Sequence, residues 1–504
     1  MLFYMFFPTP DTLYLYDNSP AQSTLHLYTQ PNLSVIVIWH ISCVSLRKKT
    51  HKKRYNFKKQ MTMKTNRLFS LSVAMCICGI ATTTAQTTYY EVEEYTPTIY
   101  MIAAGEVFEE YDPEAMRADI IEDYIETSRP GFQQAHNPQF IFATKNNRFS
   151  LALGGFVNLR TSYDFMGAVN NIDFVPYDIP MSTTYANKQR VMMDASTSRV
   201  FLKAIINSRL LGRVTVYSDM DFRGGEEFSY LPRLRSAYVN VAGFTIGRDV
   251  TTFCDLQAAP RTVDFQGPNA YNFNFNEMIR YERSFLRDHL TMGVAAEMPK
   301  VNGTYGDNFS PIMQRVPDGI VYLQYAWGAN RNSHIRASGV VRDMYLHNNL
   351  TGDNTTRVGW GAQLSGHISA TRWVDIYMNG VYGEGITPYI QDLTGSPYDI
   401  AYNPENPQQM QTMPMWGWQA AAQINFIPGM LWAAGGYSQV TLEKENGYLA
   451  DNQYRRGEHL FGNVFCNVTP NFTLALEYLR GSRENMNGTR NTANRVSLMV
   501  QYNF

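Results

Sequence analysis

Charge is scarce in this chain of 504 residues, of which only 17% are Asp, Glu, Lys or Arg, whereas 13% are aromatic. A solvated, disordered chain needs the opposite balance, so disorder is excluded as the state of the whole protein. Long hydrophobic runs are missing as well, because no apolar stretch after residue 86 approaches the ~20 residues that cross a bilayer as a helix. A helical membrane protein is therefore also excluded.

Cysteines and catalytic motifs are equally sparse. Only Cys254 and Cys466 lie beyond residue 85, and their wide separation gives neither a CxxC motif nor a metal-ligand spacing. A disulfide between them is possible in an oxidising compartment, but we do not expect one. The histidines after residue 85 form no HExxH motif, and no GxSxG elbow or P-loop occurs. We predict a protein that is not an enzyme and that uses neither a metal nor a cofactor.

The first 85 residues have the composition of a leader. A basic cluster at residues 47–59 precedes Met63-Lys64-Thr65-Asn66-Arg67, an apolar stretch at residues 68–81 and the small residues Thr83-Thr84-Ala85. This order is typical of a secretory signal peptide. We interpret residues 61–85 as that signal peptide and residues 1–60 as a non-native upstream extension from a misplaced start; a genuine N-terminal extension is the alternative. Neither Cys76 nor Cys78 closes a lipobox, so no lipid anchor is expected.

Without this leader the chain is acidic and rich in arginine. Residues 1–85 hold 10 of the 43 basic residues and 2 of the 44 acidic ones, which leaves 33 basic and 42 acidic residues. A net charge of about −9 argues against nucleic acid as a partner. Only five of the 33 basic residues are Lys, and Arg binds carboxylates and phosphates bidentately. The composition therefore suggests that the protein handles anions, although codon bias could give the same excess.

Residues 86–148 are predicted to be an acidic periplasmic extension with one short helix. Asp112 can cap this helix, Pro113 suits its first position, and the helix should end before Ser128. The apolar face of the helix is formed by Met116, Ile120, Ile121, Tyr124 and Ile125. Because so short a helix is marginal alone, it should pack on a neighbour or self-associate. The alternative is a poorly ordered tail.

Residues 149–504 alternate between apolar and polar side chains. In the first such segment Leu151, Leu153, Val157 and Leu159 share one face, with Arg160 opposite, which indicates a strand with one apolar face. Counting this one, there are about sixteen such segments, separated by tight turns and by long polar insertions at residues 166–196, 384–414 and 443–452. The pattern predicts an all-β fold, a transmembrane antiparallel up-and-down β-barrel of about 16 strands in contact with outer-membrane lipid.

A soluble periplasmic β-sandwich or propeller is the structural alternative, since one face of its sheets is also apolar. Two features favour the barrel. Aromatic residues lie at segment ends, as Tyr163 and Trp418 do, where membrane girdles occur, and no repeat of 40–50 residues is visible. The last segment also ends on Phe504, which resembles the sorting signal of Gram-negative outer-membrane barrels. We therefore expect the protein in the outer membrane of a Gram-negative bacterium.

Charged residues concentrate between residues 213 and 283. Arg233 and Arg235 share a parity, and their face should be the lumen because a charge at the lipid midplane costs ~2–4 kcal/mol. A long segment without alternation, Thr251 to Asn276, is expected to fold inward and narrow the pore. The predicted pore-lining and solute-binding residues are Arg233, Arg235, Arg248, Asp249, Arg261, Asp264 and Arg280. In the alternative interpretation these residues form rim salt bridges that only hold a loop in place.

Four runs of residues in this region carry a family resemblance. They are Asp-Phe-Arg-Gly-Gly at 221–225, Pro-Arg-Leu-Arg-Ser-Ala-Tyr at 232–238, residues 244–255 and residues 260–268. Together they resemble the DcaP-like outer-membrane porins. This chain departs from that family's pattern with Arg248 for Gln, Val250 for Trp, Cys254 for Met and Arg261 for Glu.

The resemblance implies a sixteen-stranded homotrimeric porin, often with an N-terminal periplasmic helical extension, that passes small anionic solutes such as dicarboxylates. Combined with the strand pattern, it predicts an outer-membrane porin with an Arg-lined channel for passive diffusion. The alternative is a non-conducting binding or adhesion barrel whose long loops at 384–414 and 443–452 engage ligands. A TonB-dependent transporter is disfavoured, because such barrels need about 22 strands and a plug.

Overall fold

The computed structural model describes residues 97–102, 113–135, 137–445 and 447–504. The expected signal peptide, the upstream extension and the helix cap Asp112 lie outside these residues. Within the described part of the chain, no helix is long and apolar enough to cross a bilayer.

In the described residues, one closed antiparallel sheet forms the wall of the barrel. It has sixteen strand positions, because β4 and β5 both pair with β3 on the same side and count as one. The wall strands are β3 (Phe149–Phe165), β4 (Gln189–Asp194), β5 (Arg199–Ser208), β6 (Gly212–Gly224), β7 (Leu231–Val241), β8 (Phe244–Val250), β9 (Phe275–Phe285), β10 (Leu290–Glu297), β13 (Asp318–Trp327), β14 (Ser333–Asn348), β15 (Asn354–Thr371), β16 (Val374–Glu384), β19 (Pro414–Ile427), β20 (Leu431–Leu442), β21 (Tyr454–Thr469), β22 (Phe472–Asn485) and β23 (Arg490–Asn503).

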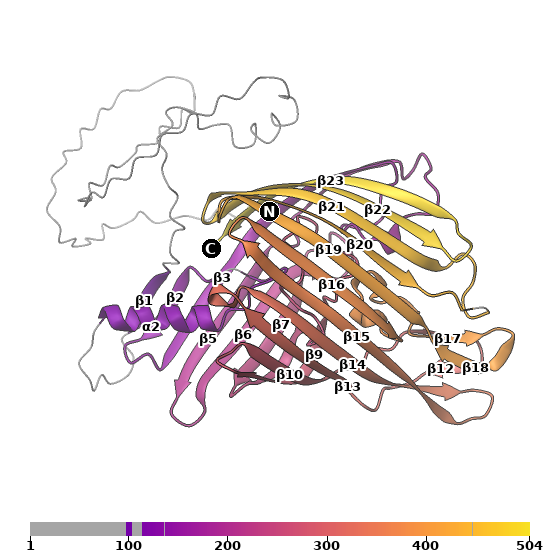
Figure 1. Cartoon of the computed structure of the whole chain (residues 1–504), viewed down its shortest axis with the longest axis horizontal. Helices are drawn as coiled ribbons and strands as arrows, with labels where there is room; N and C mark the ends of the chain where they lie inside the picture. Colours follow the sequence, from indigo (N-terminus) through magenta and orange to yellow (C-terminus); the bar gives the residue numbers. More distant parts are fainter. Residues whose placement is uncertain (1–96, 103–112, 136, 446) are drawn as a thin grey trace, which may run out of the picture. The chain divides into compact units, whose positions relative to one another are not determined.

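The sheet closes on itself between its first and last wall strands. β3 pairs with β4 and β5 at one edge and with β23 at the other, in a register that runs from Phe165↔Asn494 to Phe156↔Asn503. The remaining strands pair with their neighbours in chain order, as Figure 1 shows for β13 to β16. The predicted barrel of about 16 strands is therefore confirmed, and the two stacked sheets of a sandwich are not formed.

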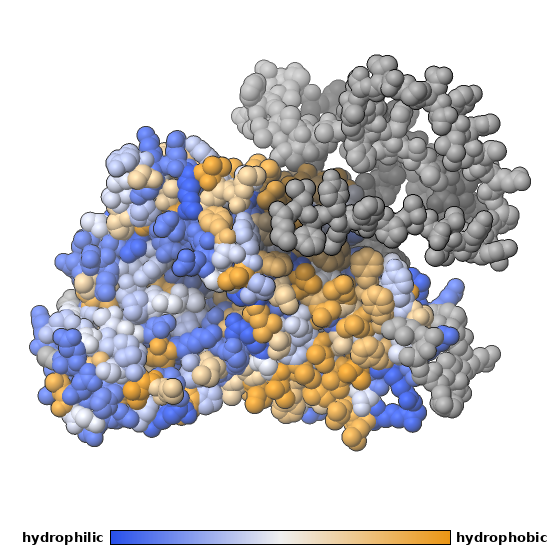
Figure 2. Space-filling model, turned by 180° about the vertical axis from the view of Figure 1, so that it is seen from behind, coloured by the Kyte–Doolittle hydropathy of each residue, from blue (hydrophilic) through white to orange (hydrophobic). Residues whose placement is uncertain are grey.

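The alternation of side chains follows the two faces of this wall. On β3, Val157 is 58% exposed on the outside, whereas Asn158 and Arg160 are buried on the inside. Figure 2 shows the hydrophobic side chains gathered over part of the outer surface, next to a hydrophilic end. In an outer-membrane barrel such an apolar band faces lipid, and the polar face lines the lumen.

Connections at the two ends of the barrel differ in length. At one end, here called the turn end, β5 and β6 are joined by a turn at residues 208–212 and β7 and β8 by a turn at 241–244. At the other, the loop end, long segments connect the strands. The loop predicted over residues 166–196 is shorter, because β4 begins at Gln189.

The loop between β16 and β19 has structure of its own. It contains the short helical turns η3 (Thr387–Tyr389) and η4 (Gln391–Leu393), followed by β17 (Ile400–Asn403) and β18 (Asn406–Thr412). Ile390, Leu393 and Tyr398 of this loop belong to the largest buried apolar cluster, together with Met415 and Val440 of the wall. The loop therefore packs against the inside of the wall. The other short elements are β11 (Gly303–Thr304), β12 (Phe309–Pro311), η1 (Pro176–Asp178) and η2 (Ala329–Arg331).

Ahead of the wall strands lie β1 (Thr98–Ile102), α2 (Pro113–Glu126) and β2 (Phe140–Thr144). The helix ends before Ser128, as predicted, and buries Ile120 and Tyr124 against β2, β3 and β5. The predicted apolar face is partly wrong, because Ile125 is 51% exposed. Tyr124 also donates a hydrogen bond from its hydroxyl to the Lys203 carbonyl, at 3.1 Å, so the helix is held to β5.

Candidate functional site

The inner face of β3 to β7 and of β23 carries a set of buried, oppositely charged residues, here called the charge ladder. It consists of Arg160, Asp164, Asp194, Arg199, Asp219, Asp221, Arg235 and Arg495. Their inward direction follows from strand parity, since Val157 and Leu159 face outward beside Arg160. The ladder therefore places several charges of both signs inside the barrel.

Ion pairs neutralise the charges of the ladder. Arg160 Nη2 lies 3.1 Å from Asp194 Oδ2, and Arg235 Nη1 lies 3.1 Å from Asp221 Oδ2. Arg495 binds both carboxylate oxygens of Asp164, at 2.5 and 3.0 Å. A buried guanidinium keeps its charge at tolerable cost only with such partners.

Two loops add further carboxylates to the ladder. Asp173, between β3 and β4, lies 2.7 Å from Arg223 Nη2 and 3.1 Å from Arg160 Nη1. Burial alone would raise the pKa of the Asp173 carboxyl, but the charges of Arg223 and Arg160 outweigh it and hold the pKa at about 2. Asp264 lies 3.5 Å from Arg160 and accepts the backbone N–H of Phe174.

Residues 251–274 form the inward loop, and wall side chains hold it in the lumen. Asn269 Oδ1 accepts a hydrogen bond from the Ser438 hydroxyl of β20 at 2.5 Å, and Asn272 Oδ1 accepts hydrogen bonds from Gln363 and Asn379. The predicted polar surface of the loop is therefore largely used in hydrogen bonds to the wall. Phe265 of the loop lies under the guanidinium groups of Arg223 and Arg235, at 4.7 and 5.2 Å.

One buried cluster on this loop contains the residue types of a hydrolase triad. Asp255 lies 2.9 Å from His334 Nε2 and accepts a 2.7 Å hydrogen bond from Ser365 Oγ. Because the serine bonds the carboxylate and not the imidazole, the histidine does not activate the hydroxyl as a base would. The cluster fixes the inward loop to β14 and β15. Among the described residues, no group of three His, Cys, Asp or Glu side chains could hold a metal.

Residues 127–135, here called the strap, run from α2 into the lumen. Arg129 pairs with Asp249 and lies 3.4 Å from Glu282, while Arg280 binds the same Asp249 at 2.9 Å. Phe132 packs edge-on against Tyr271 of the inward loop, with ring centroids 5.1 Å apart. Nothing in the sequence pattern marks this segment, since Arg129 and Phe132 contact residues more than 100 positions away.

A glycine permits the close approach of strap and inward loop. Gly131 has φ +138, and a Cβ there would lie 2.3 Å from the Leu256 carbonyl oxygen. That carbonyl accepts the backbone N–H of Phe132 at 2.7 Å. Any larger residue at 131 would separate the two segments.

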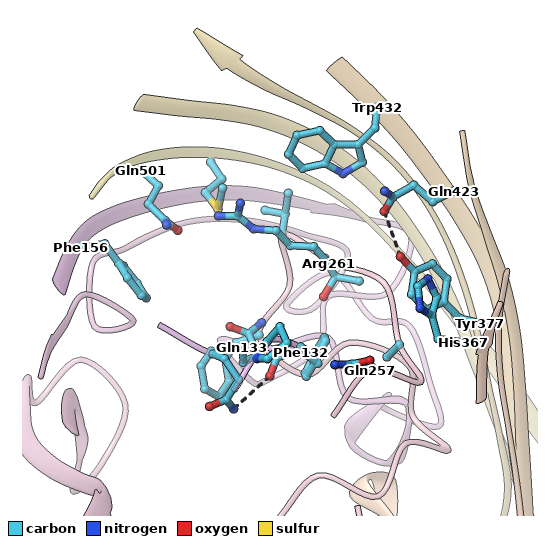
Figure 3. A pocket seen from close by; sticks show the side chains of 18 of the residues that line it. Phe132, Gln133, Phe156, Gln257, Arg261, His367, Tyr377, Gln423, Trp432 and Gln501 are labelled. Atoms are coloured by element: carbon cyan, nitrogen blue, oxygen red, sulfur yellow. Dashed lines mark hydrogen bonds between the residues drawn. The ribbon is translucent and has the colours of Figure 1, made fainter. Parts of the chain in front are cut away.

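A cavity of about 580 Å³, here called the vestibule, lies between the strap, the inward loop and the wall. Figure 3 shows Arg261 among Gln501, Tyr377 and Phe132, with Trp432 beside it. The lining residues include no Asp and no Glu. The Arg261 side chain forms no ion pair with any described residue, although its guanidinium lies 5.1 Å from the Phe465 ring. Burial without a carboxylate lowers the pKa of Arg261 to about 10.

The predicted site residues separate into three groups in space. Arg233 and Arg235 both bond Asp221, and Asp264 lies with Arg160, so these belong to the charge ladder or its edge. Asp249 and Arg280 meet Arg129 of the strap. Arg261 lines the vestibule without a charged partner. Sequence reasoning missed Arg129, Arg160, Asp173 and Arg495, although the parity of β3 and β23 indicated that Arg160 and Arg495 face the lumen.

Arg248 is the one predicted pore residue that the structure places elsewhere. It shares its parity on β8 with Phe244 and Ile246, which are 43% and 49% exposed on the outer face. Its guanidinium binds Glu277 of β9 at 2.5 Å, and Glu277 also faces outward. The prediction that Arg248 lines the lumen is therefore wrong, because residues of this parity point away from it.

Comparison with known proteins finds a family model that matches part of this chain. Residues 139–379 match the model of the DcaP outer membrane protein family. The outer membrane channel DcaP of Acinetobacter baumannii has the same fold, with a TM-score of 0.62 and 18% identity over 71% of this chain and 97% of that one. The resemblance to the DcaP family is confirmed. This DcaP-like barrel therefore belongs to the outer membrane of a Gram-negative bacterium.

Two further solved structures are more distant. OmpT of Vibrio cholerae is 11% identical, with a TM-score of 0.43 over 71% of this chain and 98% of that one. OmpF of Salmonella typhi is 15% identical, with a TM-score of 0.43 over 71% and 99%. No curated protein sequence matches this chain. The strap lies ahead of the residues that the DcaP family model matches.

Proposed function

We propose that this outer-membrane, porin-like barrel is a channel for the passive diffusion of small anionic solutes, such as dicarboxylates. The observation that supports the proposal is the vestibule, where Arg261 has no ion-pair partner and no acidic residue lines the wall. Arg233, Arg235, Asp249, Asp264 and Arg280 contribute to the field of the lumen as paired charges. A lumen in which a positive charge is left unbalanced favours anions.

Single-channel recording of the full chain in planar bilayers tests this function. In a KCl gradient we expect a reversal potential that indicates chloride preference, and Arg261→Gln should reduce that preference. The matched control is Arg331→Gln, because Arg331 lines the same vestibule but already pairs with Asp288 at 3.2 Å. Cation preference of the unmodified protein, or the absence of any conductance, would contradict the proposal.

The alternative of a non-conducting adhesion barrel depends on loops that protrude. The loop between β16 and β19 does not suit that role, because Ile390 and Leu393 are fully buried against the wall. Conductance distinguishes the two functions directly, since an adhesion barrel needs none.

A homotrimer is the second part of the proposal, and an outer groove supports it. Leu234, Ala237, Arg248 and Glu277 line this groove of about 750 Å³ on the outside of β7 to β10. A charged pair in contact with lipid is costly, so burial against another copy of the chain explains it better. The groove also lies over two of the shortest wall strands, β8 and β10.

Sedimentation of the detergent-solubilised protein tests the trimer. The unmodified chain should sediment as three copies, and Ala237→Trp, which fills the groove, should shift it toward the monomer. Val341→Trp is the control, because Val341 is 59% exposed on the outer face of β14, away from the groove. A monomeric unmodified protein, or equal dissociation by both substitutions, would refute this interface.

A further inference from the structure

Two hydrogen-bond donors that lie beside Phe465 in the vestibule are used by no described residue. One is the Arg261 guanidinium, and the other is Trp432 Nε1, which is buried without an acceptor. Both side chains pack on Phe465: the Trp432 ring stacks on it with centroids 5.3 Å apart, and the Arg261 guanidinium lies 5.1 Å from it. The fold therefore brings two unused donors to one place, and buried donors without partners are costly unless something binds them.

The rest of the vestibule is suited to a ring with polar edges. Phe132, Phe156 and Tyr377 present apolar ring surfaces, and Figure 3 shows them around the cavity. Gln133 and Gln257 point amide groups into the same region, and their side chains make no hydrogen bond to other described residues. Amides can donate to and accept from hydroxyl groups, whereas aromatic faces pack on the C–H faces of a sugar ring. The volume of about 580 Å³ lies within the ~300–1,000 Å³ typical of small-molecule sites.

The number of cations limits the charge of the ligand. Arg261 is the single cation in the vestibule without an ion pair, because Arg331 pairs with Asp288 at the rim. A dicarboxylate would leave its second carboxylate desolvated without a partner, which is unfavourable. A ligand with one carboxylate matches the site.

We propose that the vestibule is a binding site for a cyclic, polyhydroxylated solute with one carboxylate, the chemistry of a uronic acid. The carboxylate binds Arg261 and Trp432 Nε1, the hydroxyl groups bind Gln133 and Gln257, and the ring packs on the aromatic side chains. This inference rests on the proposed channel, which brings the solute to the vestibule. At this site it favours a monocarboxylate over the dicarboxylates, which the channel would pass without binding them here. It also assigns a role to Arg261, the arginine of the vestibule that has no ion pair with a described residue.

Calorimetric titration of the full chain in detergent tests the site without any need for conductance. D-glucuronate should bind, whereas D-glucose, succinate and benzoate should bind at least about tenfold more weakly, because each lacks one of the matching features. Arg261→Gln should weaken glucuronate binding by about tenfold or more, and Arg261→Lys should recover part of it. Trp432→Phe should weaken it less, and Arg490→Gln should leave it unchanged, because Arg490 pairs with Glu458 outside the vestibule.

Several results would overturn the site. Equal glucuronate binding by Arg261→Gln and the unmodified protein would remove the role of Arg261. Succinate or benzoate binding as tightly as glucuronate would refute the ligand class. Heat-modifiable gel migration shows that each variant is folded. A conducting, anion-selective protein that does not bind glucuronate refutes this site alone, whereas a binding protein without conductance refutes the channel alone.

Discussion

The arginines of the charge ladder and the arginine of the vestibule carry the same charge in different surroundings. In the ladder, Arg160, Arg199, Arg235 and Arg495 each have a carboxylate at 3.7 Å or less. In the vestibule, Arg261 has none. Ion pairs tie the ladder arginines to particular strands and loops, so those residues act mainly on structure. The electric field of an arginine without a carboxylate partner acts on the solute. Anion selectivity in this barrel should therefore depend more on whether the arginines form ion pairs than on how many arginines there are.

The largest effect should follow from breaking a ladder pair. Asp164→Asn leaves the fully buried Arg495 with only the more distant carboxylate of Asp264, 3.9 Å from Nη1, which should lower the free energy of unfolding by about 3–5 kcal/mol. Guanidinium unfolding in detergent, followed by tryptophan fluorescence, measures this change. Asp288→Asn is the control, because Asp288 is 57% exposed in its pair with Arg331 and its loss should cost about 0–1 kcal/mol. Similar losses from both variants would show that the ladder pairs are not structural.

A smaller effect should come from a carboxyl that lacks an arginine. Asp392, in the loop between β16 and β19, accepts hydrogen bonds from Tyr454, Asn269 and the Tyr177 backbone but has no cationic partner. Burial raises its pKa to about 6. The folded protein therefore binds this proton more tightly than the unfolded chain does, and stability should fall as pH rises through 6.

Between pH 5 and pH 7.5 this loss should be about 1 kcal/mol. Denaturant unfolding at the two pH values measures it, with Asp392→Asn as the control that lacks the proton. Asp173, which is paired with arginines and has a pKa of about 2, does not titrate in this window. An identical pH dependence in both proteins would contradict the raised pKa of Asp392.

The smallest effect should come from converting paired arginines into unpaired ones. Asp221→Asn releases Arg233, whose side chain is 37% exposed, and leaves Arg235 with Asp219 alone. A unit charge about 8 Å from a permeating ion changes its energy by roughly 0.5 kcal/mol in water, so anion preference should rise roughly twofold. The reversal potential in a KCl gradient measures this, and a fall in anion preference would contradict the importance of pairing.

Local periodicity was sufficient to predict the wall of the barrel. The parity of Val157 and Leu159 indicated the outer face of β3, and the inward direction of Arg233 and Arg235 followed from the same rule. That rule also gives the outward direction of Arg248, since Phe244 and Ile246 share its parity. A period-two pattern determines the face on which each side chain lies, because a shift of one residue would move every side chain to the other face.

The interior could not be predicted in the same way, because its contacts join distant parts of the chain. Arg160 meets Asp173 and Asp264 from two separate loops, and Arg129 reaches Asp249 across 120 positions. Neither pairing has a local signal in the sequence. The inward packing of the loop between β16 and β19 depends on Arg342 of β14, which bonds Asp318 and Asp399. Because Arg342, Asp318 and Asp399 are far apart in the chain, no motif in a single sequence predicts that they meet.

The join between β3 and β23 imposes an order on assembly. Arg495 and Asp164 lie on opposite sides of that join and are 331 positions apart, so neither can be shielded from water by its partner until the two strands meet. Until then both strands have free edges that could pair with other chains. When the two strands pair, their edges are no longer exposed, and the charge of Arg495 is neutralised as the side chain is buried. Closure of the barrel and neutralisation of this buried charge therefore depend on the same pair of strands.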